Sequence, residues 1–304
     1  MSFRYINPGY VALLEETSKN AVQVKNSSYC SNGVGYYKLN TTQILNCDYA
    51  NSDEFFAKFD FYFPDNESFD IYLYPFNTWS GLKISCNSSA SYVYLVYQSS
   101  TNKSVSNENT NLKRQTINTI YYYANWATNE VLVKVNGKTI FSIQNYSRMP
   151  YRQQNYIVLT GGSATAPISN IIISDEYIDP KEQIIKLPIS STESDMTFDS
   201  ETGIYTATTT NQSLLSAVNV NALAEEYGGD SQVTGVALVG NPAYKTAEGL
   251  SSLTAFSKDS SGNATNYGTY ALGSDSSGVI ADSQILTGKT ISDLQNLKFG
   301  WIAK

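Results

Sequence analysis

Apolar and polar residues alternate with a period of two in many short segments of the chain, which predicts β-strands rather than helices. The clearest example begins at Glu130, where valines occupy every second position up to Val135 and lead directly into Asn136-Gly137. This dipeptide accepts positive φ at both central positions of a two-residue type I′ turn. The segment therefore predicts a hairpin whose second strand ends near Ile143.

The most aromatic alternation is FFAKFDFYF, which occupies residues 55–63. Successive side chains of a strand point to opposite faces of its sheet. One face carries Phe55, Ala57, Phe59, Phe61 and Phe63, and the other carries Phe56, Lys58, Asp60 and Tyr62. We expect the first face to lie in a core and the second to be half-solvated.

Residues 1–180 contain about ten segments of this kind and no credible helix, which is typical of a two-sheet sandwich. The composition changes near Asp179-Pro180: 30 aromatic residues and all three cysteines precede this point, and 9 aromatic residues follow it. We therefore predict domains over 1–180 and 181–304. The second is expected to be a smaller β-sandwich, with a first strand over 183–189 and a short helix over 221–227 stopped by Gly228-Gly229.

Composition narrows the possible chemistry. The chain has 24 tyrosines and no histidine, so any catalysis would depend on carboxylates, lysine or tyrosine. The net charge is −7 and no basic run is present, so we do not expect a nucleic-acid partner. The three cysteines lack a CxxC spacing, and we expect free, buried thiols.

The beginning of the chain has no basic segment followed by an apolar one, and no stretch approaches eighteen consecutive apolar residues. We therefore expect a protein made in the cytoplasm without a signal peptide and not inserted in a membrane.

Two parts of residues 1–180 resemble the concanavalin A-like lectin family, which includes laminin-G-like domains. The first is Trp126 followed by the valine strand and Asn136-Gly137, and the second is ISNIIISDE over residues 168–176. The resemblance implies an all-β jelly-roll sandwich, followed here by the second β domain.

A further resemblance concerns the end of the chain. The segment TISDLQNLKFG over residues 290–300 looks like the ending of structural proteins from tailed phages and prophages. This resemblance implies a non-enzymatic tail or fibre protein located in a virion or prophage-derived particle, with other virion subunits as partners. Fibre proteins are symmetric and sandwich edges need covering, so we also expect a homo-oligomer.

A lectin-like domain would bind a cell-surface polysaccharide by stacking aromatic rings on sugar C–H faces, with polar groups beside them. The candidates for this role are Trp79, Asn77, Tyr36, Tyr37 and Tyr97. No cofactor is expected except possible calcium, which would be bound by carboxylates at a loop rim. The calcium candidates are Asp48, Asp53 and Asp175, each of which is also explained as a turn residue.

The alternative function is a carboxylate-based glycoside hydrolase or lyase on the same fold, which needs two acidic residues flanking the scissile bond. Enzymes of this family are similar to one another in an E-x-D-x-x-E strand. Neither Asp53-Glu54 nor the Glu67 to Asp70 segment reproduces that pattern. Solvated strand edges explain these carboxylates better, so we predict a protein that is not an enzyme.

Overall fold

The structure is a computed structural model of the 304-residue chain and divides into two compact units, Met1–Ile185 and Lys186–Lys304. The described residues are 4–7, 22–25, 35–39, 42–46, 52–64, 68–74, 80–98, 100–149, 156–160, 166–240, 243–246, 250–276 and 280–304.

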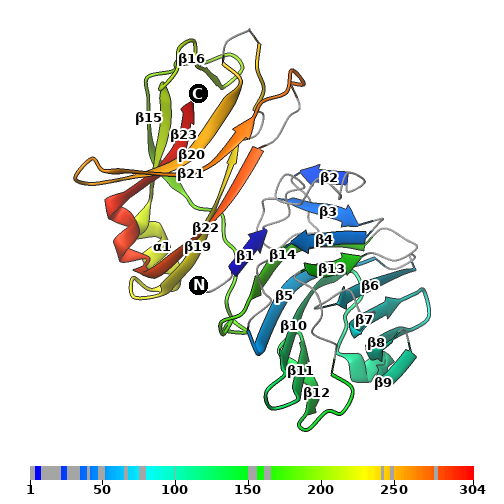
Figure 1. Cartoon of the computed structure of the whole chain (residues 1–304). Helices are drawn as coiled ribbons and strands as arrows, with labels where there is room; N and C mark the ends of the chain where they lie inside the picture. The colour runs from blue at the N-terminus through cyan, green and yellow to red at the C-terminus, as the bar shows by residue number, and fades with distance from the viewer. Residues whose placement is uncertain are drawn as a thin grey trace. The chain divides into compact units, whose positions relative to one another are not determined.

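The first unit contains two antiparallel sheets (Figure 1). Sheet A has the order β12 (Lys138–Ile143), β11 (Glu130–Val135), β10 (Thr116–Asn125), β5 (Glu54–Phe63), β14 (Ala166–Ser174), β3 (Gly35–Leu39) and β2 (Val22–Lys25), with β1 (Arg4–Asn7) also paired to β14. Sheet B has the order β4 (Thr42–Asn46), β13 (Tyr156–Thr160), β6 (Phe69–Tyr74), β7 (Gly81–Cys86), β8 (Ser91–Tyr97) and β9 (Ser100–Ser106). The all-β class and the two-sheet arrangement predicted for this part are confirmed.

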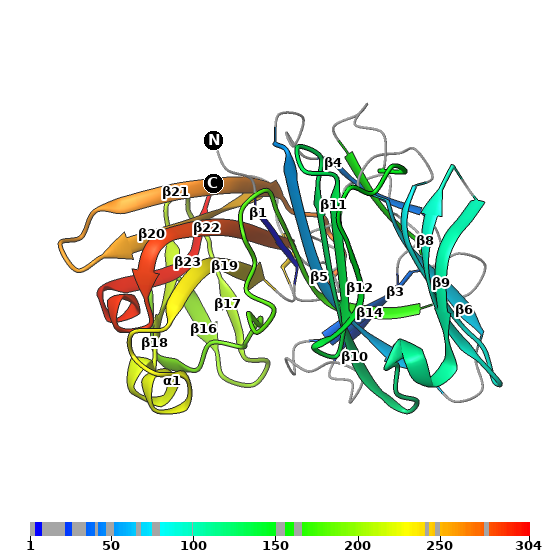
Figure 2. The same cartoon turned by 90° about the horizontal axis from the view of Figure 1, so that it is seen from below.

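The core of the first unit lies between these sheets, which form two separate layers in Figure 2. Alternate residues of β5, including Phe55, Phe59 and Phe61, face inward against Ile71 and Leu73 of β6. All five of these side chains are at most 1% exposed. The predicted inward face of the FFAKFDFYF strand is thus confirmed.

The opposite face of β5 is not half-solvated, so that expectation was wrong. Phe56, Lys58 and Asp60 are only 4%, 8% and 6% exposed. Ile178 and Ile184 belong to the same apolar cluster as Phe56, because the chain leaving β14 packs back over sheet A. The covering segment belongs to the first unit, which ends at Ile185.

The predicted hairpin turn is confirmed, since φ is 50° at Asn136 and 78° at Gly137. The Asn136 side chain also joins the turn to its surroundings. Its Oδ1 accepts from the Thr119 backbone N–H at 2.9 Å, and its Nδ2 donates to the Asn111 carbonyl at 2.8 Å and to Asn118 Oδ1 at 2.9 Å. The turn residue is therefore also the centre of a polar network.

Tyr122 of β10 is fully buried in the core, and its hydroxyl has no hydrogen-bond partner among the described residues. Burial raises its pKa, so the folded state keeps the phenol neutral at pH values where the unfolded chain ionises. The stability that the folded state gains by keeping the Tyr122 phenol neutral is complete below about pH 10 and decreases as the pH rises above it.

We therefore expect alkaline destabilisation of the first unit. Above pH 10 the free energy of unfolding should fall by about 1.4 kcal/mol per pH unit through Tyr122 alone. Urea unfolding between pH 7 and 11.5 measures this slope. Tyr122→Phe is the matched variant. At pH 7 it should change the free energy of unfolding little, because the lost hydroxyl is unpaired. Above pH 10 it should make the decrease of this free energy with pH shallower. An unchanged slope would contradict the assignment.

Cys86 is a buried free thiol, as expected, and desolvation raises its pKa. Cys30 and Cys47 lie outside the described residues.

The second unit is also β-rich. Its five-stranded sheet has the order β15 (Ile189–Ser194), β18 (Ser213–Val218), β23 (Leu297–Ala303), β20 (Ser252–Asp259) and β21 (Ala264–Ala271). Two further antiparallel pairs join β16 (Thr197–Asp199) to β17 (Ile204–Thr206) and β19 (Gln232–Gly240) to β22 (Ile280–Thr290). The short 3-10 helix η4 (Ser292–Asn296) precedes β23.

The predicted short helix is confirmed as α1 (Val220–Tyr227). The Asn219 side chain caps it by accepting from the Ala222 N–H at 3.1 Å, and Gly228 follows with φ of 85°. The strand predicted over 183–189 was wrong, because Ile184 packs against sheet A and β15 begins only at Ile189.

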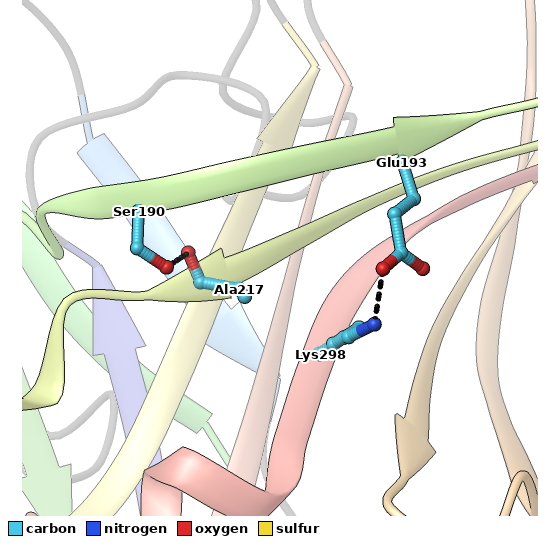
Figure 3. Close-up of polar contacts among 4 residues, drawn as sticks. All are labelled: Ser190, Glu193, Ala217 and Lys298. Atoms are coloured by element: carbon cyan, nitrogen blue, oxygen red, sulfur yellow. Dashed lines mark hydrogen bonds and ion pairs between the residues drawn. The ribbon is translucent and has the colours of Figure 1, made fainter.

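Strand β15 lies at the edge of the five-stranded sheet, and all six of its residues are exposed. Polar contacts attach it to the rest of the sheet (Figure 3). Ser190 Oγ donates to the Ala217 carbonyl of the adjacent β18 at 3.2 Å, and Lys298 of β23, one strand further in, forms an ion pair with Glu193. The ion pair is exposed and lowers the pKa of Glu193, but such pairs contribute little stability.

Candidate functional site

Tyrosines gather on the face of sheet B that points away from the core. On β6 and β8 the apolar residues Ile71, Leu73, Val93 and Leu95 face inward. Alternation therefore directs the tyrosines between them outward. We use the name tyrosine face for this surface, whose members are Tyr72, Tyr92, Tyr94, Lys83, Asp70 and Ser85.

Strand register brings these residues into two adjacent rows. In the first row Tyr72 pairs with Lys83, and Lys83 pairs with Tyr94 across the next strand. In the second row Asp70 pairs with Ser85, and Ser85 pairs with Tyr92. Side chains directly opposite one another across antiparallel strands are near neighbours. Residues from three strands therefore form one continuous surface.

Lys83 lies at the centre of the tyrosine face. Its Nζ is 5.0 Å from the ring centroid of Tyr72 and 5.7 Å from that of Tyr94, both within cation–π range. The same Nζ forms an ion pair with Asp70 Oδ2 at 3.1 Å, and Tyr72 Oη donates to this oxygen at 3.1 Å. The ammonium is thus fixed between two rings and its charge is balanced locally.

The rings are oriented by one another as well as by Lys83. Tyr92 and Tyr94 stack with centroids 5.6 Å apart and an interplanar angle of 19°, and both remain half-buried. Tyr72 lies 5.5 Å from Tyr74, which is only 3% exposed. The accessible rings are therefore held in place by packing before any ligand arrives.

The electrostatics of the tyrosine face favour stable protonation states at neutral pH. Burial lowers the pKa of Lys83, but its interactions with Tyr72 and Asp70 outweigh burial, and the net pKa is raised. Desolvation raises the pKa of Tyr94. Tyr94 thus remains a neutral hydrogen-bonding group and Lys83 remains an ammonium, which suits recognition of hydroxyl groups better than proton transfer.

Of the five predicted ligand-binding residues, the three that the structure describes lie on different sheets. Trp79 and Asn77 lie outside the described residues. Tyr36 and Tyr37 lie on β3 of sheet A, where Tyr37 pairs with Ile168. Tyr97 is at the end of β8, beyond the register shift between Leu95 and Val96, and it is half-buried.

Two of the three calcium candidates lie in the part of the chain that the structure describes. Asp48 lies outside the described residues, Asp53 is exposed just before β5, and Asp175 is half-buried just after β14. Pairing of Ser174 with Phe56 places the latter two at the same end of sheet A. Among the described residues, no group of three or more acidic or cysteine side chains lies together as a metal site would require.

Sequence reasoning missed most of the tyrosine face, although the signal was present. The segments YLY at 72–74 and YVY at 92–94 each place two tyrosines on the same side of a strand. The sequence alone does not show that β6 and β8 both pair with β7, which inserts Lys83 between them.

No model of a protein family matches the sequence, and no curated protein matches it. Similar solved structures include the receptor-binding domain of botulinum neurotoxin C/D mosaic serotype, which is 13% identical with a TM-score of 0.39 over 79% of this chain and 66% of that chain. The ligand-binding domain of botulinum neurotoxin serotype D in complex with N-acetylneuraminic acid is 11% identical, with a TM-score of 0.38 over 98% of this chain and 91% of that chain. Sheep galectin-11 in complex with glycerol is 13% identical, with a TM-score of 0.30 over 43% of this chain and 95% of that chain.

This chain spans just under two thirds of the C/D mosaic receptor-binding domain. Identities and TM-scores this low assign no family to the chain. In the described part of the chain, no helix is both long enough and apolar enough to cross a membrane.

Proposed function

We propose that the first unit binds carbohydrate through the tyrosine face of sheet B. The observation that carries this proposal is the row in which Lys83 lies between the rings of Tyr72 and Tyr94, with Asp70 beside it. Aromatic faces supply contact area for sugar C–H groups, and the ammonium, carboxylate and phenol groups supply hydrogen bonds to hydroxyls. Asp70 is paired with a lysine, which supports binding rather than carboxylate-based hydrolysis.

A glycan array probed with the full chain, followed by titration of the strongest ligand, tests this proposal. Tyr92→Ala combined with Tyr94→Ala should weaken binding by about five- to 150-fold, because each ring contributes about 0.5–1.5 kcal/mol and 1.4 kcal/mol is a factor of ten. Tyr177→Ala is the control, since Tyr177 is 63% exposed and lies outside the tyrosine face. A folded double variant with unchanged affinity would exclude this face as the site.

We also propose that the chain serves as a structural subunit of a phage or prophage tail or fibre, and that it assembles as a homo-oligomer. The support is the resemblance of residues 290–300 to the endings of such proteins. In this setting the tyrosine face would contact a host polysaccharide, and the second unit would contact other subunits. Mass spectrometry of purified particles, together with light scattering of the isolated protein, tests location and oligomeric state separately.

A further inference from the structure

A pocket lies within the first unit, on the outer side of sheet A. Its volume is about 300 Å³, at the small end of the range for ligand sites. Strands β5, β10 and β14 form its floor, and the segment Lys181–Ile184, which we call the cover segment, forms its wall. The floor residues are Lys58, Asp60, Ile117, Thr119, Asn170 and Ile172.

Hydrogen bonds from both neighbouring strands hold the Asp60 carboxylate at the centre of this floor. Asp60 Oδ1 accepts from Thr119 Oγ1 at 2.6 Å, and its Oδ2 accepts from Asn170 Nδ2 at 2.7 Å. Asn170 has φ of 53° and lies within the register shift between Ser169 and Ile172 of β14. The bulge directs the amide toward Asp60, and bulges often re-aim a side chain in this way.

The cover segment is attached to the floor. Lys58 Nζ donates a hydrogen bond to the Glu182 carbonyl, and Ile184 packs against the apolar cluster of sheet A. A molecule in the pocket would contact both the floor and the cover segment. Its binding energy would therefore oppose opening of the cover segment.

The lining has chemistry that selects among ligands. It carries two lysines and two acidic residues, so its formal charges cancel, and neither an anion nor a cation is favoured overall. Three isoleucines provide apolar surface beside the hydroxyl, amide and carboxylate groups. Sugars and similar polyols present C–H surfaces and hydroxyls together. We propose that this pocket binds a small neutral polyhydroxylated molecule of monosaccharide size, and that the bound molecule holds the cover segment against sheet A.

The test measures binding and closure on the full chain. Glucose, galactose, mannose and glycerol are titrated by NMR, with gluconate and glucosamine as charged analogues. Tryptic cleavage after Lys181, which is exposed, is followed at the same time. A neutral sugar at ten times its Kd should slow this cleavage up to about tenfold, because cleavage requires an open cover segment. The charged analogues should protect less.

Two variants locate the effect. Thr119→Val removes a hydroxyl without changing the side-chain size, and Ile117→Trp fills the pocket, so both should reduce the protection. The Tyr92→Ala and Tyr94→Ala double variant should keep it, which separates failure of this pocket from failure of the tyrosine face. Absence of protection by every neutral polyol at saturating concentration, or protection unchanged in Ile117→Trp, would overturn the proposal.

Discussion

Replacing Asp60 with alanine should lower the free energy of unfolding of the first unit by about 3–5 kcal/mol, because it removes a carboxylate that offsets burial of the Lys58 ammonium and leaves the Thr119 and Asn170 donors without this acceptor. Asp60 and Lys58 point to the same face of β5, two residues apart, and both are more than nine-tenths buried. Desolvation lowers the pKa of Lys58, and attraction to Asp60 and other carboxylates opposes that shift. Without Asp60, less negative charge would offset the cost of burying the Lys58 ammonium.

Hydrogen exchange over β5, in the full chain, measures this loss within the first unit alone. Asp60→Asn keeps the shape of the side chain, and its free energy of unfolding should fall less than that of Asp60→Ala, because an acceptor for the Thr119 hydroxyl remains. The decisive comparison is Lys58→Met combined with Asp60→Leu. Removing both charges should restore part of the stability, since apolar replacements of buried pairs are often neutral. A double variant as unstable as the sum of the single variants would contradict this account.

Asn136→Gly should destabilise the first unit by about 2–3 kcal/mol even though glycine suits the turn. Glycine adopts positive φ without strain, so the backbone cost is small. The variant instead removes three hydrogen bonds, made to Thr119, Asn111 and Asn118. Each lost hydrogen bond contributes about 0.5–1.5 kcal/mol, and the three together account for the expected loss. Urea unfolding at pH 7 measures the change.

Asn129→Gly is the matched control for this prediction. Asn129 also has positive φ, at 53°, but it is exposed. Its substitution should change stability by less than about 0.5 kcal/mol, as surface changes usually do. Equal losses in the two variants would show that backbone conformation, and not the side-chain network, determines the effect at Asn136.

The sequence predicts those features of the fold that depend on local pattern. The FFAKFDFYF alternation and the valine alternation before Asn136 both form strands in the structure, because alternation and turn chemistry are local signals. Strand β9 was missed because its sequence STNKSVS has almost no apolar residues. It is held at the edge of sheet B by pairing with β8, which no local pattern reveals.

The candidate sites depend on contacts between distant segments, which explains why they were harder to foresee. Lys83 gains its role only when β7 lies between β6 and β8. Likewise, Lys58 looks solvated in the sequence and becomes buried only because a segment more than a hundred residues later returns over sheet A. A period-two pattern assigns a residue to a face, but it does not show what covers that face.

The return of residues 178–185 over sheet A has a practical consequence for dividing the protein. A fragment cut at the compositional boundary after Pro180 would lack Ile184 and the Glu182 carbonyl that receives the Lys58 hydrogen bond. The exposed surface would then include Phe56 and part of an apolar cluster, and exposed apolar patches of this kind promote aggregation. Expression of the first unit alone therefore requires a fragment that extends at least to Ile185.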